Sequence, residues 1–148
     1  MTSKILADAG AIVGALSERD QHYHQAWTKF AELPKPLYTC EAVITEVMFV
    51  LRHVVGGKEK TLGLISDGVL RIDFSLSDEI EAVRSLIEKY ESVPMSLADA
   101  CLVRMSELFD SPIFTFDGDF RIYRRNGRQR IPLLGLEDKA GCSTRVLM

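Results

Sequence analysis

The 148-residue chain lacks most of the features that mark specialised classes of protein. It has three cysteines, Cys40, Cys101 and Cys142, and no CxxC pair, so we expect neither a disulfide framework nor a zinc site. Cys40 and Cys101 lie in apolar stretches, which favours buried thiols in a reducing cytosol. No apolar run reaches 18 residues and no signal peptide opens the chain, so we predict a cytoplasmic protein without a membrane span.

Several catalytic signatures are missing as well. Gly10 and Gly14 do not have the spacing of a GxGxxG dinucleotide loop, and the chain has no P-loop, no GxSxG elbow and no Ser-His-Asp order. The net charge is −3, which excludes a general electrostatic attraction to nucleic acid and leaves only local contacts. The composition, 47% hydrophobic and 26% charged, is that of one soluble domain with its own core.

Short apolar strands alternate with helical stretches along the chain. This alternation predicts an α/β fold with a central, mostly parallel sheet and helices on both faces. We expect one domain over residues 1–135 and a C-terminal tail over 136–148. The expected strands cover 4–7, 37–40, 69–74, 112–116 and 131–134; the expected helices cover 11–16, 18–33, 42–55 and 58–66, with two more beginning at Ser77 and Ser96.

Two aspartates directly follow predicted strands. Asp8 comes after the first strand and Asp117 after the apolar run 112–116, with Asp119 two residues further on. Because ligands of parallel sheets bind at the carboxyl ends of the strands, Asp8 and Asp117 are candidate site residues that should share one edge. The structural alternative for Asp8 is an ordinary helix N-cap.

Two further acids are predicted in the first turns of helices near the same edge. Glu46 is the one charged residue of the apolar helix 42–55 before Arg52, and a buried carboxylate is costly unless it is paired or bound to a cation. The alternative is a narrow polar stripe that Glu46 shares with Arg52 and His53. Asp99 completes an S-x-x-D capping box with Ser96, which explains it structurally.

A cluster of carboxylates repels itself unless a cation neutralises it. Ligands that are all oxygen, with no Cys or His among them, favour Mg²⁺ or Mn²⁺ over zinc. Such ions activate water and stabilise the leaving oxygen of a phosphodiester. A basic cluster just after the acids could hold phosphates, with Arg121, Arg124 and Arg125 the candidate RNA contacts, although a charge run is often only solvated surface.

These motifs, in this order and spacing, resemble the PIN domain and more narrowly the VapC-type toxin ribonucleases. The residues that carry the resemblance are Asp8, Thr45-Glu46, Asp99 in LADA, and Thr115-x-Asp117-x-Asp119-Phe120. It spans roughly residues 4–135 and includes Asp20-x-His22. It implies a three-layer α/β/α sandwich, a homodimer, cleavage of RNA that depends on Mg²⁺ or Mn²⁺, and inhibition by an antitoxin protein. It also implies that four acids bind the metal ion and act in catalysis: Asp8, Glu46, Asp99 and Asp117. Asp119 would be an accessory metal ligand, and the hydroxyl of Thr115 would support the site.

Gly10 departs from this pattern, because many members carry Ser, Thr or Asn two residues after the first aspartate. The main hypothesis is an active metal-dependent endoribonuclease, and the alternative is a catalytically weak module that binds RNA or protein. A phosphatase of the DxD kind is less favoured, because the Asp117-Gly118-Asp119 sequence lacks the Thr expected next. The apolar helix 42–55 makes a dimer plausible.

Overall fold

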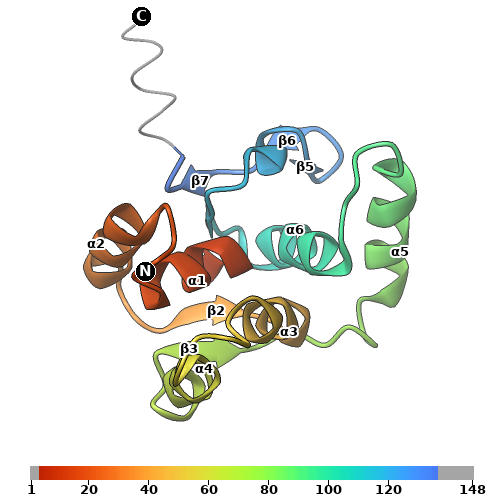
Figure 1. Ribbon diagram of the computed structural model, residues 1–148. Helices are drawn as coiled ribbons and strands as arrows, with labels where there is room; N and C mark the ends of the chain where they lie inside the picture. Colours follow the sequence, from red (N-terminus) through yellow and green to blue (C-terminus); the bar gives the residue numbers. More distant parts are fainter. Residues whose placement is uncertain (1–3, 137–148) are drawn as a thin grey trace, which may run out of the picture.

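The computed structural model describes residues 4–136, so the predicted tail lies almost entirely outside the described residues. Five strands form the central sheet in the order β3-β2-β1-β4-β7, and every neighbouring pair is parallel (Figure 1). The predicted α/β class and parallel sheet are therefore confirmed. The strands are short: β1 Leu6–Ala7, β2 Leu37–Thr39, β3 Leu70–Ile72, β4 Ile113–Phe114 and β7 Leu133–Leu134.

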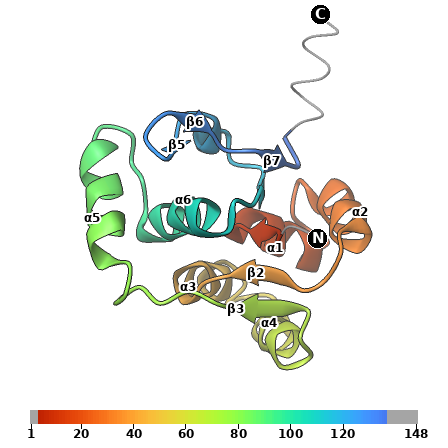
Figure 2. The same ribbon diagram turned by 180° about the vertical axis from the view of Figure 1, so that it is seen from behind.

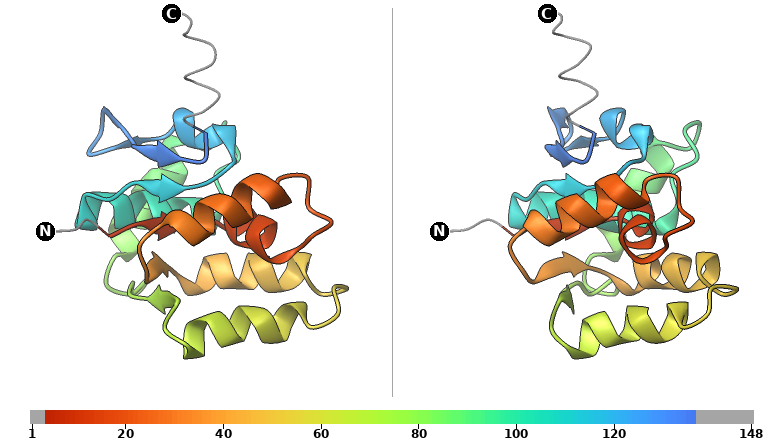
Figure 3. Two further views of the ribbon diagram at one scale, coloured as in Figure 1. Left: turned by 90° about the vertical axis from the view of Figure 1, so that its left-hand side faces the viewer. Right: turned by 60° about the vertical axis from the view of Figure 1, so that its left-hand side comes forward.

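Helices flank this sheet and complete the three-layer α/β/α sandwich. On one side α1 packs against α2 and α3, and α3 and α4 lie side by side (Figure 3). On the other side α5 packs against α6 (Figure 2). Among the described residues, no helix is long and apolar enough to cross a membrane. The helices are α1 Ala9–Leu16, α2 Tyr23–Glu32, α3 Glu41–Val50, α4 Gly57–Ser66, α5 Ile80–Lys89 and α6 Leu97–Phe109.

Three predicted boundaries were wrong. The helix expected over 18–33 begins only at Tyr23, because residues 17–22 form turns. The helix expected over 42–55 ends at Val50, where the chain turns although its sequence stays apolar. The helix expected to begin with Ser77 as its cap has Glu79 at that position instead.

The basic stretch 121–130 forms a hairpin that was not predicted. Strands β5 Arg124–Arg125 and β6 Gln129–Arg130 pair antiparallel. Asn126 and Gly127 between them both have positive φ, 51° and 85°. The Asn-Gly pair is a strong turn signal, so this hairpin was readable from the sequence.

The core lies between the sheet and the helices. Leu6, Ile113 and Phe114 of the central strands are fully buried, together with Leu102 and Met105 of α6. The helices α1 and α2 approach closely at Gly14, where an added Cβ would lie 2.8 Å from the Cβ of Ala26. This close approach fixes how α1, which begins directly after Asp8, sits against its neighbours.

Candidate active site

The centre of the sheet is the point where its strand order reverses, because the chain adds β2 and β3 on one side of β1 and β4 and β7 on the other. Ligands of open α/β sheets bind at such a switch point. Asp8 and Asp117 follow the two central strands, as predicted, and the backbone N–H of Asp8 donates to Phe114 O at 3.0 Å. The strand-end reasoning therefore placed both residues at the correct edge.

Thr115 connects these two aspartates. Its side chain is fully buried, and Oγ1 donates to Asp8 Oδ2 at 2.7 Å. The same Oγ1 accepts from the backbone N–H of Asp117 at 2.9 Å. One hydroxyl thus fixes the carboxylate of Asp8 and the backbone that carries Asp117.

Asp8 is 5% exposed and caps α1, with Oδ1 accepting from the backbone N–H of Ala9 at 2.7 Å. Burial raises the pKa of Asp8 to about 7, and the charges of Asp99 and Asp117 act in the same direction. The hydrogen bonds from Thr115 and Ala9 act against this rise. Asp8 is therefore the N-cap of α1, as the structural alternative predicted, but its burial disfavours the charged form of its carboxyl group.

Asp99 comes from the first turn of α6, and its predicted capping box is present. Its backbone N–H donates to Ser96 Oγ at 3.0 Å, and its Oδ2 accepts from the Ser96 N–H at 3.2 Å. A second donor, the hydroxyl of the fully buried Tyr123, lies 3.3 Å from the same Oδ2. Burial raises the pKa of Asp99, and the charge of Asp117 raises it further.

Glu46 lies in the second turn of α3, whereas the sequence predicted the first turn. It is half-buried, and its pKa is raised by burial and then by the charges of Asp99 and Asp117. The shared polar stripe with Arg52 and His53 does not form, because α3 ends at Val50. Arg52 instead donates to Phe49 O at 2.6 Å and stacks over the Phe49 ring. Glu46 therefore faces other acids without a basic partner.

Asp117 is exposed, and its Oδ1 accepts from the Asp119 N–H at 2.9 Å, which caps the short 3₁₀ helix Gly118–Arg121. The charge of Asp117 contributes to the raised pKa of each of Asp8, Glu46 and Asp99. Asp119 is half-buried, and its charge contributes to the raised pKa of Tyr123. Asp99 has a similar part, because its charge contributes to the raised pKa of both Asp8 and Glu46.

Four acids from distant parts of the chain therefore share one edge of the sheet. Among the residues that the structure describes, no Lys or Arg forms an ion pair with any of them. Within 4–136, no three Asp, Glu, His or Cys side chains converge closely enough to hold one metal ion as they stand. The result is a negative cluster without a basic partner, in which burial and neighbouring charges raise the pKa values of Asp8, Glu46 and Asp99.

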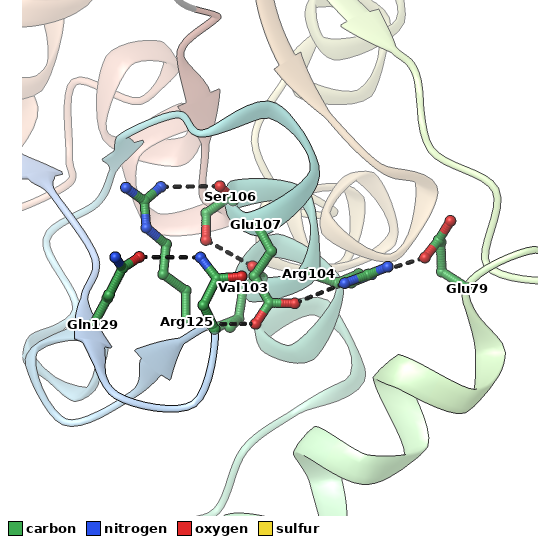
Figure 4. Close-up of polar contacts among 8 residues, drawn as sticks. Glu79, Val103, Arg104, Ser106, Glu107, Arg125 and Gln129 are labelled. Atoms are coloured by element: carbon green, nitrogen blue, oxygen red, sulfur yellow. Dashed lines mark hydrogen bonds and ion pairs between the residues drawn. The ribbon is translucent and has the colours of Figure 1, made fainter.

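The three candidate RNA-contacting arginines have different environments. Arg125 is buried, and its Nη1 donates to Ser106 O at 2.9 Å (Figure 4). Its Nη2 donates to Asp110 Oδ1 at 2.7 Å. This burial argues against the predicted contact of Arg125 with RNA. Arg124 is half-buried, and its Nη1 donates to three backbone carbonyls of residues 121–123. Arg121 is exposed and donates to Leu136 O at 3.1 Å.

Sequence reasoning missed Tyr123, whose hydroxyl reaches Asp99. Its one signal was an aromatic residue inside a basic run, which does not reveal burial.

The Asp20-x-His22 segment lies beside the strand that leads to Asp117, because the ring of His22 stacks on Phe116 with centroids 4.6 Å apart. Asp20 Oδ2 accepts from the His22 N–H at 2.9 Å and so fixes the turn before α2.

Comparison with known proteins agrees with this fold. The crystal structure of the Mycobacterium tuberculosis toxin VapC20, described as cleaving the sarcin-ricin loop, superposes with a TM-score of 0.71 at 18% identity. The match covers 78% of this chain and 92% of that one, and it shows a shared fold. No curated protein matches the chain. The model of the PIN domain family matches residues 5–126, which is most of the chain. The protein therefore belongs to the PIN domain family.

Proposed function

We propose that the protein is a metal-dependent endoribonuclease that hydrolyses RNA phosphodiester bonds. One observation carries the proposal: Asp8, Glu46, Asp99 and Asp117 share the switch-point edge of the sheet, where no side chain of the described residues neutralises them. Folding does not favour uncompensated carboxylates. A cluster of this kind is explained if a cation and an anionic substrate occupy the edge together.

The donor set fits Mg²⁺ or Mn²⁺, because every candidate ligand is a carboxylate oxygen. Asp99 Oδ1 and Asp117 Oδ2 accept no hydrogen bond from the described residues and are available to a cation. Mg²⁺ keeps several of its waters, so it does not need the carboxylates to close tightly around it. The four acids would hold the ion, with Asp119 as an accessory ligand. When bound, it would supply an activated water and stabilise charge at the phosphate.

The remaining side chains would position the reactants. Thr115 holds Asp8 and the backbone of Asp117 in fixed relation. Arg121 is exposed in the turn that follows Asp117 and would contact the RNA backbone, with Arg124 beside it contributing less because its Nη1 is already bonded to carbonyls. Phosphate contacts of this kind position the RNA without reading its sequence.

The fold shared with VapC20 supports a toxin role with a protein antitoxin as partner. A homodimer is supported by α3, whose Phe49 and Val50 are 63% and 54% exposed, since clustered apolar surface favours association. Sedimentation of Phe49→Glu beside the wild-type chain tests the dimer. An unchanged sedimentation coefficient would show that Phe49 of α3 does not contribute to a dimer interface.

The decisive experiment is RNA digestion with Mg²⁺, with Mn²⁺ and with EDTA. The wild-type protein should cleave only with a metal ion, and Asp8→Asn should not cleave. Asp67→Asn, which removes an exposed aspartate far from the cluster in the sequence, is the control and should cleave normally. Equal cleavage by the wild-type protein and Asp8→Asn would refute the proposal.

The alternative is a PIN-fold module that binds RNA or protein with little turnover. It is favoured by Gly10, which is exposed in the first turn of α1 and offers no side chain beside Asp8. Tight RNA binding that needs no metal ion, with no cleavage in the same assay, would select this alternative.

A further inference from the structure

Tyr123 occupies an unusual position for a buried tyrosine. Its side chain is fully buried, and its hydroxyl lies 3.3 Å from Asp99 Oδ2. Buried tyrosine hydroxyls need a hydrogen-bond partner, and most are satisfied by any nearby polar group. Here the acceptor is one of the four acids of the candidate active site. Because a tyrosine hydroxyl is protonated at neutral pH, it donates to the carboxylate.

The ring of Tyr123 is held rigidly. It packs edge to face against Tyr90, with centroids 5.1 Å apart, and against Phe120 at 5.3 Å. The Tyr123 N–H also donates to Asp119 O at 3.2 Å, which ties the residue to the turn after Asp117. The hydroxyl therefore reaches Asp99 from a fixed platform, and it connects the turn that carries Asp117 and Asp119 to the start of α6.

The two oxygens of Asp99 are consequently different. Oδ2 accepts both from the Ser96 N–H and from the Tyr123 hydroxyl, whereas Oδ1 accepts from no donor among the described residues. Two donors on one oxygen fix the rotation of the carboxylate and present the other oxygen to a ligand. Groups that hold a metal-binding carboxylate in this way typically alter metal affinity by 10–100-fold.

We propose that Tyr123 is a positioning residue of the active site, whose hydroxyl orients Asp99 for a divalent cation. The inference rests on the proposed function and adds to it a residue that touches neither metal nor RNA. It predicts that removing this one hydroxyl weakens metal binding even when the fold is intact.

The chain offers a matched control in the same aromatic cluster. Tyr90 is also buried, and its hydroxyl accepts from the Arg124 N–H at 2.9 Å. Both Tyr123→Phe and Tyr90→Phe remove one buried hydroxyl and one hydrogen bond while they keep the ring. They differ in that only the Tyr123 hydroxyl contacts an acid of the site.

The experiment is calorimetric titration of the full chain with Mn²⁺ in the absence of RNA, with circular dichroism to verify folding. Tyr123→Phe should raise the Kd for Mn²⁺ about tenfold, and Tyr90→Phe should leave it unchanged. In RNA cleavage, Tyr123→Phe should lower kcat without raising KM, and a high Mn²⁺ concentration should restore part of the loss.

Each other outcome has one meaning. If wild-type protein binds Mn²⁺ and Tyr123→Phe binds it equally well, the inference is overturned and the proposed function stands. If Tyr90→Phe weakens Mn²⁺ binding as much as Tyr123→Phe does, the effect comes from packing and the inference is again overturned. If the wild-type chain neither binds Mn²⁺ nor cleaves RNA, the proposed function fails and this inference fails with it.

Discussion

Two regions of this molecule hold partly buried charges, and they treat them in opposite ways. Between α5, α6 and the β5–β6 hairpin, two arginines pair with carboxylates. Arg104 contacts Glu79 at 2.7 Å and Glu107 at 3.0 Å (Figure 4). Arg125 contacts Asp110 at 2.7 Å. At the switch-point edge, Asp8 and its three acidic neighbours accept hydrogen bonds from uncharged groups such as Thr115 and Tyr123, but no Lys or Arg of the described residues forms an ion pair with them.

We interpret the charges of the first region as structural, because they stabilise the fold, and those of the second region as ligand-binding. In the first region the protein supplies both signs, so the charges are paired without a ligand, although Nε of the buried Arg125 has no hydrogen-bond partner among the described residues. In the second, burial and the charges of neighbouring acids raise the pKa values of Asp8, Glu46 and Asp99, which costs stability in the metal-free protein. Substitutions in the first region should therefore affect folding, and substitutions in the second should affect activity.

The largest expected effect is that of Asp117→Asn on RNA cleavage. The amide oxygen of Asn can still accept from the Asp119 N–H, so the turn that Asp117 Oδ1 caps should survive. Only the charge is lost, and we expect the cleavage rate to fall by at least about 100-fold, or roughly 3 kcal/mol of transition-state stabilisation. Rates measured with Asp119→Asn in parallel should fall less, as befits an accessory ligand. The ranking of the two acids is wrong if Asp119→Asn is the more damaging variant.

The next effect is on stability and belongs to the paired region. Arg125→Met keeps an apolar stem but removes the ion pair with the exposed Asp110 and the bond to Ser106 O, so we expect a loss of about 2 kcal/mol. Urea unfolding measures it, and Arg128→Met, at an exposed arginine of the same hairpin, should cost little. Cleavage per folded molecule should stay normal in both variants. A selective loss of RNA affinity in Arg125→Met would instead indicate that Arg125 contacts RNA.

A third effect is the pH dependence of the metal-free protein. The pKa of Asp8 is about 7 in the folded state and near 3.8 in a model peptide, so the folded state binds the proton more tightly. Its contribution to stability is therefore complete at low pH and is lost as the pH rises to about 7. We expect the unfolding free energy to fall by about 2 kcal/mol between roughly pH 5 and 8.

Urea unfolding in EDTA across this pH range measures the effect. Asp8→Asn should show a shallower pH dependence and higher stability near neutral pH, whereas Asp67→Asn should behave like the wild-type protein. Added Mn²⁺ should restore stability at high pH, by about 3 kcal/mol at 100 times its Kd. A wild-type protein whose stability rises with pH over this range would contradict the assigned environment of Asp8.

The two regions also differ in how far the sequence predicts them. The positions of Asp8 and Asp117 could be predicted from the sequence, because residues that directly follow parallel strands lie at the carboxyl-end edge of the sheet. Arg125 could not, because buried and solvated arginines look alike within a charge run. The partner of Arg125 is Asp110, at the far end of α6, and only tertiary packing brings them together.

The boundaries of α3 show a second limit of the sequence. Leu51, Val54 and Val55 continue its apolar pattern beyond Val50, although the chain turns at Leu51 and Val55 is exposed, because apolar periodicity alone does not mark where a helix ends. The prediction of a helix over 42–55 then brought Arg52 and His53 onto the face of Glu46, and that face does not exist. Tyr123 is similar, since its contact with Asp99 depends on a hairpin that was not predicted.

The smallest effect concerns Gly10, beside the unpaired acids. An added Cβ at Gly10 would meet no atom within 4 Å, so the site can accept a side chain without strain. Gly10→Ser and Gly10→Ala should each stabilise α1 by roughly 0.5 kcal/mol, because Gly is a poor helix former. Only Gly10→Ser supplies the hydroxyl that the family resemblance leads us to expect at this position, and we expect it to raise the cleavage rate by about twofold to fivefold, within the roughly 1 kcal/mol that one hydrogen bond contributes. Thermal unfolding and RNA cleavage of both variants separate the two contributions. If Gly10→Ala accelerates cleavage as much as Gly10→Ser, the gain comes from a firmer α1 holding Asp8, and the missing hydroxyl has no part in how this site works.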